Sequence, residues 1–406
     1  MNFKRTILEC AATSLLLFPV LASAQIIEFK EDAVIEMQTK SLTNSGQAKD
    51  IGEDWNNDQL NIIYSNIDFT LKILEHKFNA SWFLRHSNSD LYQDDRLALN
   101  YHLFPRKVIA RDLFRTQYIH ETQTTRTESI LNKFTYEFGD EDFYFKLGRM
   151  YVNYGEGYMA NPLNPFNLPQ FSGTHAKFNQ GNDGMQVKIQ NDDKLILKIY
   201  VFQDRSYREY HDEKLTRTFM LHGDWQYKPD TNVQYVLGED QKRHKYGLQV
   251  KKTIEKGMGY FQVVRFSQKL DQQEAYEKGL THYILGGEYQ VSDKLTTRLE
   301  IGKQEFSENL DEANHLSTTF IPMNKFAALI NSYQHSDKHK TVFLYARDGE
   351  TKFAIAKAEH NYAPKDNHDV FVRVLVPITK TDGEDSLGTL QRTLATEATF
   401  GIRLFY

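Results

Sequence analysis

Strict alternation of apolar and polar residues is the feature that most limits what this chain can fold into. In residues 78–85, apolar side chains occupy every even position, and Asn79, Ser81 and Arg85 occupy odd ones. A two-residue period places alternate side chains on opposite faces of a β-strand. No helical period extends over a long window, so the sequence predicts an all-β fold. The same alternation recurs in residues 184–189, 193–202, 281–290, 296–302 and 369–376.

Short turns and long polar connections alternate between the predicted strands. Counting the strands gives about 20, or 18 if the two weakest segments, near residues 26–40 and 324–334, are merged with their neighbours. That leaves roughly 19 residues for each strand with its connection, which fits membrane strands of about 9–11 residues. The short turns are predicted at residues 104–107, 139–142, 191–194, 228–231, 255–258, 291–294 and 363–368.

The first 24 residues have the pattern of a secretory signal peptide. A basic start with Lys4 and Arg5 precedes an apolar run over residues 11–21, and the sequence Ala-Ser-Ala ends at residue 24. The alternative, a short membrane anchor, is disfavoured because the apolar run is too short to span a bilayer. The chain has one cysteine, Cys10, within this segment. The predicted mature chain, from residue 25, therefore has no disulfide, which fits a Gram-negative envelope protein.

A soluble β-sandwich would also alternate apolar and polar residues. A mean hydropathy of −0.59 and 25% charged residues would suit one. The export signal, the unbroken series of hairpins and the full charges on the polar face favour a membrane barrel, because a sheet in lipid must close on itself. Aromatic residues, 13% of the chain, gather near predicted strand ends. We therefore predict an all-β fold: a single closed antiparallel transmembrane β-barrel of 18–20 strands over residues 25–406, in the bacterial outer membrane.

The chain ends on an alternating strand, residues 399–406, whose last residue is aromatic. This ending resembles the C-terminal signature of bacterial outer-membrane β-barrel proteins. The resemblance implies that the barrel-assembly machinery reads this strand, and we expect the strand to close the barrel against the first strand, near residues 26–40. The recognised outer face would consist of Phe400, Ile402, Leu404 and Tyr406.

Residues 146–171 resemble a pattern found in alginate-export-type and related outer-membrane porins. Gly148 and Arg149 match the end of the porin strand, although Met150 stands where Gln is usual. Residues 154–157, Tyr-Gly-Glu-Gly, stand for a Trp-Gly-x-Gly, and residues 161–164, Asn-Pro-Leu-Asn, stand for an Asn-Pro-Leu-Asp. The resemblance implies that Arg149 anchors the loop that follows. Arg149 also departs from the parity of its own strand, which predicts a bulge there.

Residues 153–182 form the longest predicted connection and contain three of the nine prolines. Proline stiffens a loop and removes a backbone donor, and exposed aromatic residues would be unfavourable in water. We expect this loop to fold into the lumen and narrow it; the alternative is a loop packed on the rim. The candidate constriction residues are Tyr154, Tyr158, Asn161, Pro162, Asn164, Phe166 and Phe171.

Charged residues on the polar parity are the candidate lumen residues. Four basic residues fall on four consecutive predicted strands and could form a strip that favours anions. The alternative is a network of paired charges, for which Glu359 and Glu397 are available partners. The candidates are Arg149, Arg298, Glu300, Arg347, Lys357, Arg373 and Arg403, of which Arg347, Lys357, Arg373 and Arg403 make up the basic strip.

The predicted function is a porin that lets small hydrophilic solutes diffuse passively, including anionic solutes or acidic saccharides if the basic strip is free. An outer-membrane barrel enzyme and a structural or adhesion barrel with a blocked lumen are the alternatives, but catalytic motifs are missing from the sequence. A net charge of −5 argues against nucleic-acid binding. The expected partners are outer-membrane lipid, lipopolysaccharide, the assembly machinery and a small solute, and the sequence does not indicate an oligomeric state.

No cofactor and no metal site are predicted. Four histidines, however, lie beside predicted turns on neighbouring strands and could approach one another. Their spacing does not match a metal-binding motif, so we expect solvated side chains at the rim. These residues are His335, His339, His360 and His368.

Overall fold

The computed structural model describes residues 27–43, 58–89, 109–110, 117–122, 124–164, 181–191, 194–208, 212–240, 243–268, 278–305, 323, 325–350, 353–378 and 396–406. The predicted signal peptide lies outside these ranges. Within them, no helix is long and apolar enough to cross a membrane.

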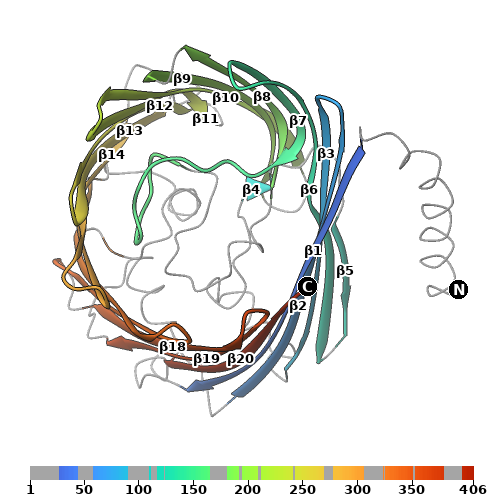
Figure 1. Ribbon diagram of the computed structural model, residues 1–406, viewed down its shortest axis with the longest axis vertical. Coiled ribbons are helices and arrows are strands. Elements are labelled where there is room, and N and C mark those ends of the chain that lie inside the picture. The colour runs from blue at the N-terminus through green and yellow to red at the C-terminus, as the bar shows by residue number, and fades with distance from the viewer. Residues whose placement is uncertain are drawn as a thin grey trace, which may run out of the picture.

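Eighteen of the strands in the described ranges pair edge to edge in one closed antiparallel ring (Figure 1). Each strand pairs with the next, except that β3 pairs with β6, and β20 pairs back to β1. The predicted barrel is confirmed, at the lower end of the predicted strand number. The ring strands are β1 (Ile27–Thr43), β2 (Asp58–Ile73), β3 (His76–Asn88), β6 (Thr125–Gly139), β7 (Phe143–Met150), β8 (Asn182–Asn191), β9 (Leu195–Arg208), β10 (Asp212–Lys228), β11 (Thr231–Asp240), β12 (Arg243–Ile254), β13 (Gly257–Gln268), β14 (Lys278–Gln290), β15 (Leu295–Glu305), β16 (Lys325–Ser336), β17 (His339–Asp348), β18 (Ala354–Lys365), β19 (His368–Ile378) and β20 (Thr396–Phe405).

Two short strands, β4 (Ile109–Ala110) and β5 (Gln117–Glu121), extend the wall where ring strands are short. β7 and β8 have only 8 and 10 residues. β5 pairs with β6 beyond the last pair that β6 makes with β7, and β4 pairs with β9 beyond its last pair with β8. The two strands therefore continue the hydrogen bonding of β6 and β9 past the point where the chain leaves the wall at the end of β7.

The C-terminal strand closes the ring. Residues 396–405 pair in antiparallel register with residues 34–43. Beyond this ladder, the N–H of Tyr406 donates to the carbonyl of Ala33 at 2.9 Å, and the N–H of Ala33 donates to the carbonyl of Tyr406 at 3.0 Å. The expectation that the last strand pairs with the first is confirmed, and the final residue is hydrogen-bonded into the wall.

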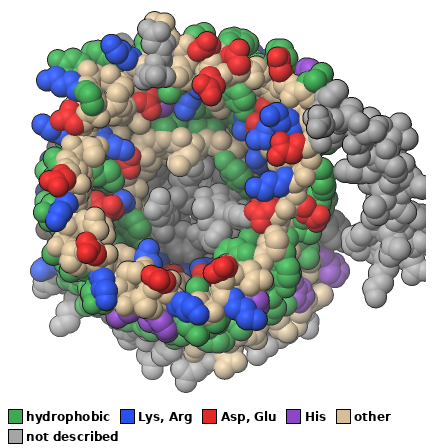
Figure 2. All heavy atoms as spheres, in the orientation of Figure 1, with side chains coloured by type: hydrophobic (Ala, Val, Ile, Leu, Met, Phe, Trp, Pro, Cys, Tyr) green, Lys and Arg blue, Asp and Glu red, His purple; other side chains and the backbone are tan. Residues whose placement is uncertain are grey.

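Side chains alternate between the outer and inner faces of the ring. On β20, Phe400 points outward and is 51% exposed, and Tyr406, just after the strand, also points outward and is 69% exposed, whereas Thr399 and Arg403 point inward and are buried. Apolar residues on an outer face and polar residues on an inner face suit a barrel that lies in lipid. Figure 2, which views one end of the ring, shows charged side chains around its rim.

Two apolar clusters lie on the inner face of the ring, although polar residues are expected on a wall that faces a water-filled lumen. Each cluster combines residues of the chain that follows β7 with residues of the wall. One cluster joins this chain to β13, β14 and β16–β18, and the other joins it to β9–β11 and β13. The chain after β7 therefore covers apolar patches on two parts of the inner wall.

Candidate functional site

Residues 151–164, called here the lumenal segment, leave β7 and run inside the ring (Figure 1). Two side-chain amides fix its turns: Asn161 Nδ2 donates to the carbonyl of Tyr154 at 2.9 Å, and Asn164 Nδ2 donates to the carbonyl of Val152 at 3.1 Å. Gly157 has a φ of +139°, and a Cβ atom there would lie 2.0 Å from a carbonyl oxygen of the same segment. Only glycine fits this turn.

Glu300 holds the middle of the lumenal segment. This β15 carboxylate is fully buried on the inner wall. It accepts a hydrogen bond from the N–H of Met159 at 2.7 Å, another from the N–H of Tyr158, and a third from the hydroxyl of Tyr260 on β13. Hydrogen bonds to an ionised acceptor are roughly twice as strong as neutral ones. Because two of these donors are backbone N–H groups, Glu300 holds the backbone of the segment against the wall. These two hydrogen bonds do not depend on which side chains occupy positions 158 and 159.

Two glutamines on neighbouring strands hold the preceding turn of the segment. The N–H of Gly155 donates to Gln234 Oε1 of β11 at 3.0 Å, and the N–H of Glu156 donates to Gln249 Oε1 of β12 at 2.7 Å. The carboxylate of Glu156 pairs with Lys251 Nζ at 2.7 Å. Two hydrogen bonds and one ion pair thus join the segment to β11 and β12.

Lys245 of β12 holds the far end of the segment. Its ammonium is fully buried, donates to the carbonyl of Leu163 at 2.6 Å and lies 5.2 Å from the ring centre of Phe266. Sequence reasoning missed Lys245 and Gln249. The signal that could have found them is their shared parity, opposite to the outward-facing Tyr246 and Leu248.

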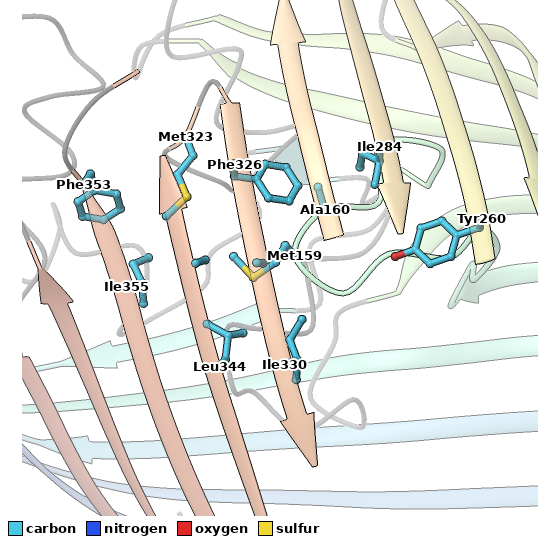
Figure 3. Packing of buried hydrophobic residues seen from close by; sticks show 12 residues of the cluster. Met159, Ala160, Tyr260, Ile284, Met323, Phe326, Ile330, Leu344, Phe353 and Ile355 are labelled. Atoms are coloured by element: carbon cyan, nitrogen blue, oxygen red, sulfur yellow. The ribbon is translucent and has the colours of Figure 1, made fainter. Parts of the chain in front are cut away.

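Apolar contacts complete the attachment. Figure 3 shows Met159 and Ala160 of the lumenal segment among inward-pointing side chains of the wall, including Phe326, Ile330 and Leu344. Met159 is fully buried in this cluster. Burial of an apolar side chain of this size contributes about 1.5–3 kcal/mol, so the segment is fixed by packing as well as by hydrogen bonds.

Arg149 lies at the base of the segment, at the end of β7, and is 3% exposed. Its Nε and Nη2 atoms donate to the two carboxylate oxygens of Asp183 on β8 at 2.7 and 2.9 Å. Its Nη1 atom donates to the carbonyl of Leu131 on β6 at 2.8 Å. The register irregularity lies on β6, beside Leu131, rather than on the strand of Arg149. Gly148, with a φ of +113°, precedes Arg149 and accounts for its departure from strand parity.

Arg298 of β15 lies beside the ring of Tyr158 in the lumenal segment. Arg298 Nη2 donates to Glu288 of β14 at 2.8 Å, and its guanidinium lies 5.7 Å from the ring centre of Tyr158. Burial, reinforced by the negative charge of Glu359, raises the pKa of the Tyr158 phenol. The phenol is therefore neutral at physiological pH and takes part as a ring and a hydroxyl, not as a charge.

Three residues of the predicted basic strip point inward, and each has a carboxylate partner. Lys357 and Arg373 both contact Glu359, at 3.3 and 2.9 Å. Arg403 donates to Glu36 and lies 3.6 Å from Asp369. This is the paired arrangement that the sequence left as the alternative to a free basic strip.

The fourth member of the strip was placed wrongly. Arg347 lies on the outer face, exposed, on the same side of β17 as Phe343 and Tyr345. The inward positions of β17 are Leu344 and Ala346, which are buried in the cluster around Met159. The lumenal segment covers this part of the wall, so the apolar side chains of Leu344 and Ala346 can face inward. The two faces of β17 are therefore the reverse of those predicted.

The remaining predicted residues divide into two groups. Pro162 is buried within the lumenal segment, whereas Phe166 and Phe171 lie outside the described residues, so that part of the predicted constriction stays a prediction.

Among the residues that the structure describes, no group of three or more His, Cys, Asp or Glu side chains could hold a metal ion.

The comparison with known proteins gives likeness in structure and not in sequence. No protein-family model matches the chain, and no curated protein matches it in sequence. The fold is similar to that of OccAB1 of Acinetobacter baumannii (TM-score 0.58, 8% identity, 93% of this chain and 96% of that chain). It is also similar to OccD3 (OpdP) of Pseudomonas aeruginosa (TM-score 0.57, 11% identity, 93% and 91%) and to OprD of Pseudomonas aeruginosa (TM-score 0.56, 10% identity, 93% and 94%).

Proposed function

We propose that this chain is an outer-membrane channel through which small hydrophilic solutes diffuse past the lumenal segment. The ring is closed, its outer face is apolar and its inner face carries charges, as in a transmembrane barrel. The Occ and OprD proteins that share its fold are outer-membrane porins of Pseudomonas and Acinetobacter. We propose the same location for this chain, with lipid and lipopolysaccharide around the wall.

The attachment of the lumenal segment to Glu300 is the observation that carries the proposal. A structural barrel needs no backbone segment held across its interior by a buried carboxylate. A channel that must select solutes does need one, because a narrow and rigid passage sets the size limit. In this proposal the segment divides the lumen, and solutes pass between it and the charged wall of β18–β20 and β1.

Pairing of the basic residues bears on selectivity. Lys357, Arg373 and Arg403 each share their charge with a carboxylate, so a passing anion meets alternating charges on this wall. We propose that the channel admits small hydrophilic solutes of either charge and that any preference for acidic saccharides is modest. Among the residues that the structure describes, no feature favours an enzyme over this passive role.

Reconstitution tests the proposal. The mature chain, residues 25–406, is inserted into planar bilayers, and stepwise current changes are expected. Liposome swelling then compares glucose with glucuronate, and we expect similar rates for the two sugars. A barrel that inserts but gives neither current steps nor swelling would instead be the structural barrel with a blocked lumen.

A further inference from the structure

Three histidines meet on the outer face of the ring, far from the lumen. The hydroxyl of Thr341 lies 2.8 Å from His335 Nε2 and 2.9 Å from His360 Nδ1, and His360 Nε2 lies 3.4 Å from His339 Nδ1. These four side chains, from β16, β17 and β18, are called the histidine cluster. The sequence placed the three histidines on neighbouring strands, where they could approach one another, and in the structure the ring of His360 contacts those of His335 and His339.

The cluster lies at the border between the apolar outer face and the turns at one end of the barrel. Tyr333 and Tyr362 flank it, with ring centres 4.6 Å from His335 and 4.4 Å from His339. The next outward-facing row toward the middle of the wall contains the exposed residues Phe343 and Val374. Figure 2 shows histidine side chains at the outer edge of the ring near β18. Tyrosines at such a border mark the level of lipid headgroups.

We propose that the histidine cluster binds the phosphate of a membrane phospholipid, and binds it more tightly when its imidazoles are protonated. A neutral imidazole has one donor and one acceptor nitrogen, so the contact between His339 and His360 needs one nitrogen without a proton. When both rings are protonated, both nitrogens are donors and the contact becomes repulsive. A phosphate oxygen between them accepts both N–H groups in charge-assisted hydrogen bonds.

The charged groups around the cluster balance one another, so protonated imidazoles would supply the positive charge that attracts an anion. Two lysines and two aspartates lie in or next to the turn between β16 and β17 and the turn between β18 and β19, all exposed. Lys340 of β17 has the inward parity of Leu344 and lies on the opposite face of the wall. On this face β19 presents His368, beside the turn, and then the apolar Val370 and Val372. The charged residues are Asp337, Lys338, Lys365 and Asp366.

The phosphate would come from the bilayer and not from solution, because the cluster borders side chains that face lipid. The inference therefore rests on the proposed membrane location. Its pH dependence follows from imidazole chemistry, since histidine gains its proton between about pH 8 and pH 5. An outer-membrane barrel would hold such a lipid more firmly in an acidified periplasm.

Native mass spectrometry of the mature chain in detergent micelles tests the inference, with palmitoyl-oleoyl phosphatidylglycerol as the probe. We expect retention of one lipid to be about tenfold stronger near pH 5.5 than near pH 8. His360→Gln should remove this difference. His86→Gln is the matched control, because His86 also lies exposed on the outer face and contacts one threonine, Thr127, at 2.9 Å; it should leave the difference unchanged.

Three results would overturn the inference. Equal lipid retention at both pH values would mean that the histidine cluster does not cause the retention. Loss of the pH difference in His86→Gln as well as in His360→Gln would mean the same. Displacement of the lipid by inorganic phosphate at the same concentration would mean that the site takes a soluble anion. Flotation with phospholipid vesicles separates these results from failure of the proposed membrane location. A folded chain that does not float with the vesicles is not a membrane barrel. A chain that floats but shows no pH-dependent lipid retention contradicts the lipid site alone.

Discussion

Glu300 on β15 accepts a hydrogen bond from the backbone N–H of Met159 at 2.7 Å, and through this contact the wall holds a segment inside its own ring. The two residues are 141 positions apart in the chain. The bond joins a strand carboxylate to the backbone of a segment that packs apolar side chains on the same wall.

Replacing Glu300 with Ala should release the lumenal segment. The variant loses the acceptor for two backbone N–H groups and one hydroxyl, and each hydrogen bond to a charged group contributes about 1.5–3 kcal/mol. Single-channel conductance should rise, and current noise should increase as the segment moves. Glu288→Gln is the control, because Glu288 pairs with Arg298 and no hydrogen bond to the segment from Glu288 is seen in the described residues. Equal conductance in wild type and Glu300→Ala would contradict this account of the segment.

Removing Arg149 should destabilise the barrel strongly. Arg149→Met leaves Asp183 without the two hydrogen bonds at 2.7 and 2.9 Å, and breaking a buried ion pair in this way costs about 3–5 kcal/mol. The free energy of unfolding, measured by urea titration from lipid vesicles, should fall by this amount. Lys77→Met serves for comparison. Lys77 lies 3.8 Å from Glu137 with its side chain 45% exposed, so the loss there should stay below about 1 kcal/mol.

Removing a carboxylate from the wall should shift ion selectivity. Glu359→Gln frees both Lys357 and Arg373 from their shared partner. The ratio of anion to cation permeability, obtained from reversal potentials in a salt gradient, should rise roughly twofold to fivefold, because charge lining a narrow passage concentrates counter-ions. Arg347→Gln should leave the ratio unchanged, since this side chain lies on the outer face. A change with Arg347→Gln as large as that with Glu359→Gln would place the basic residue back in the lumen.

Deleting Tyr406 should impair assembly. The deletion removes two backbone hydrogen bonds to Ala33 and the aromatic residue that resembles an assembly signal. The heat-modifiable folded fraction in outer-membrane extracts should drop several-fold. Any single-residue deletion in residues 380–393 should have little effect. If both kinds of deletion assemble equally well, the terminus has no special role.

The barrel could be predicted from the sequence because its signal is local. Alternation within one strand, as in residues 78–85, reports which face each side chain takes, and a short turn fixes the neighbour. The position of Arg403 on the inner face and that of Phe400 on the outer face follow from this parity. The pairing of the first and last strands needed only one further physical rule, that a membrane sheet has no open edge.

The site could be predicted only in part because its contacts are long-range. Glu300 was singled out as a wall charge, but its role depends on Tyr158, 142 positions away. The two faces of β17 were predicted the wrong way round for the same reason, because the position of the lumenal segment does not follow from the strand pattern. Apolar Leu344 and Ala346 face inward because Met159 covers them. Alternation cannot distinguish an apolar side chain that faces lipid from one that faces a segment inside the lumen. Lys245 was missed for a related reason, since its partner is a backbone carbonyl of that segment.

Single-channel recording with a cysteine at position 158 tests the central claim most directly. Residues 25–406 contain no cysteine, so Tyr158→Cys in a protein of these residues gives a single reactive group on the lumenal segment. Wild-type protein should show discrete current steps that a cationic methanethiosulfonate reagent leaves unchanged. In the Tyr158→Cys variant the reagent should reduce each step. Steps that the reagent does not alter in the variant, or the lack of any steps in the wild type, would contradict a channel narrowed by residues 151–164.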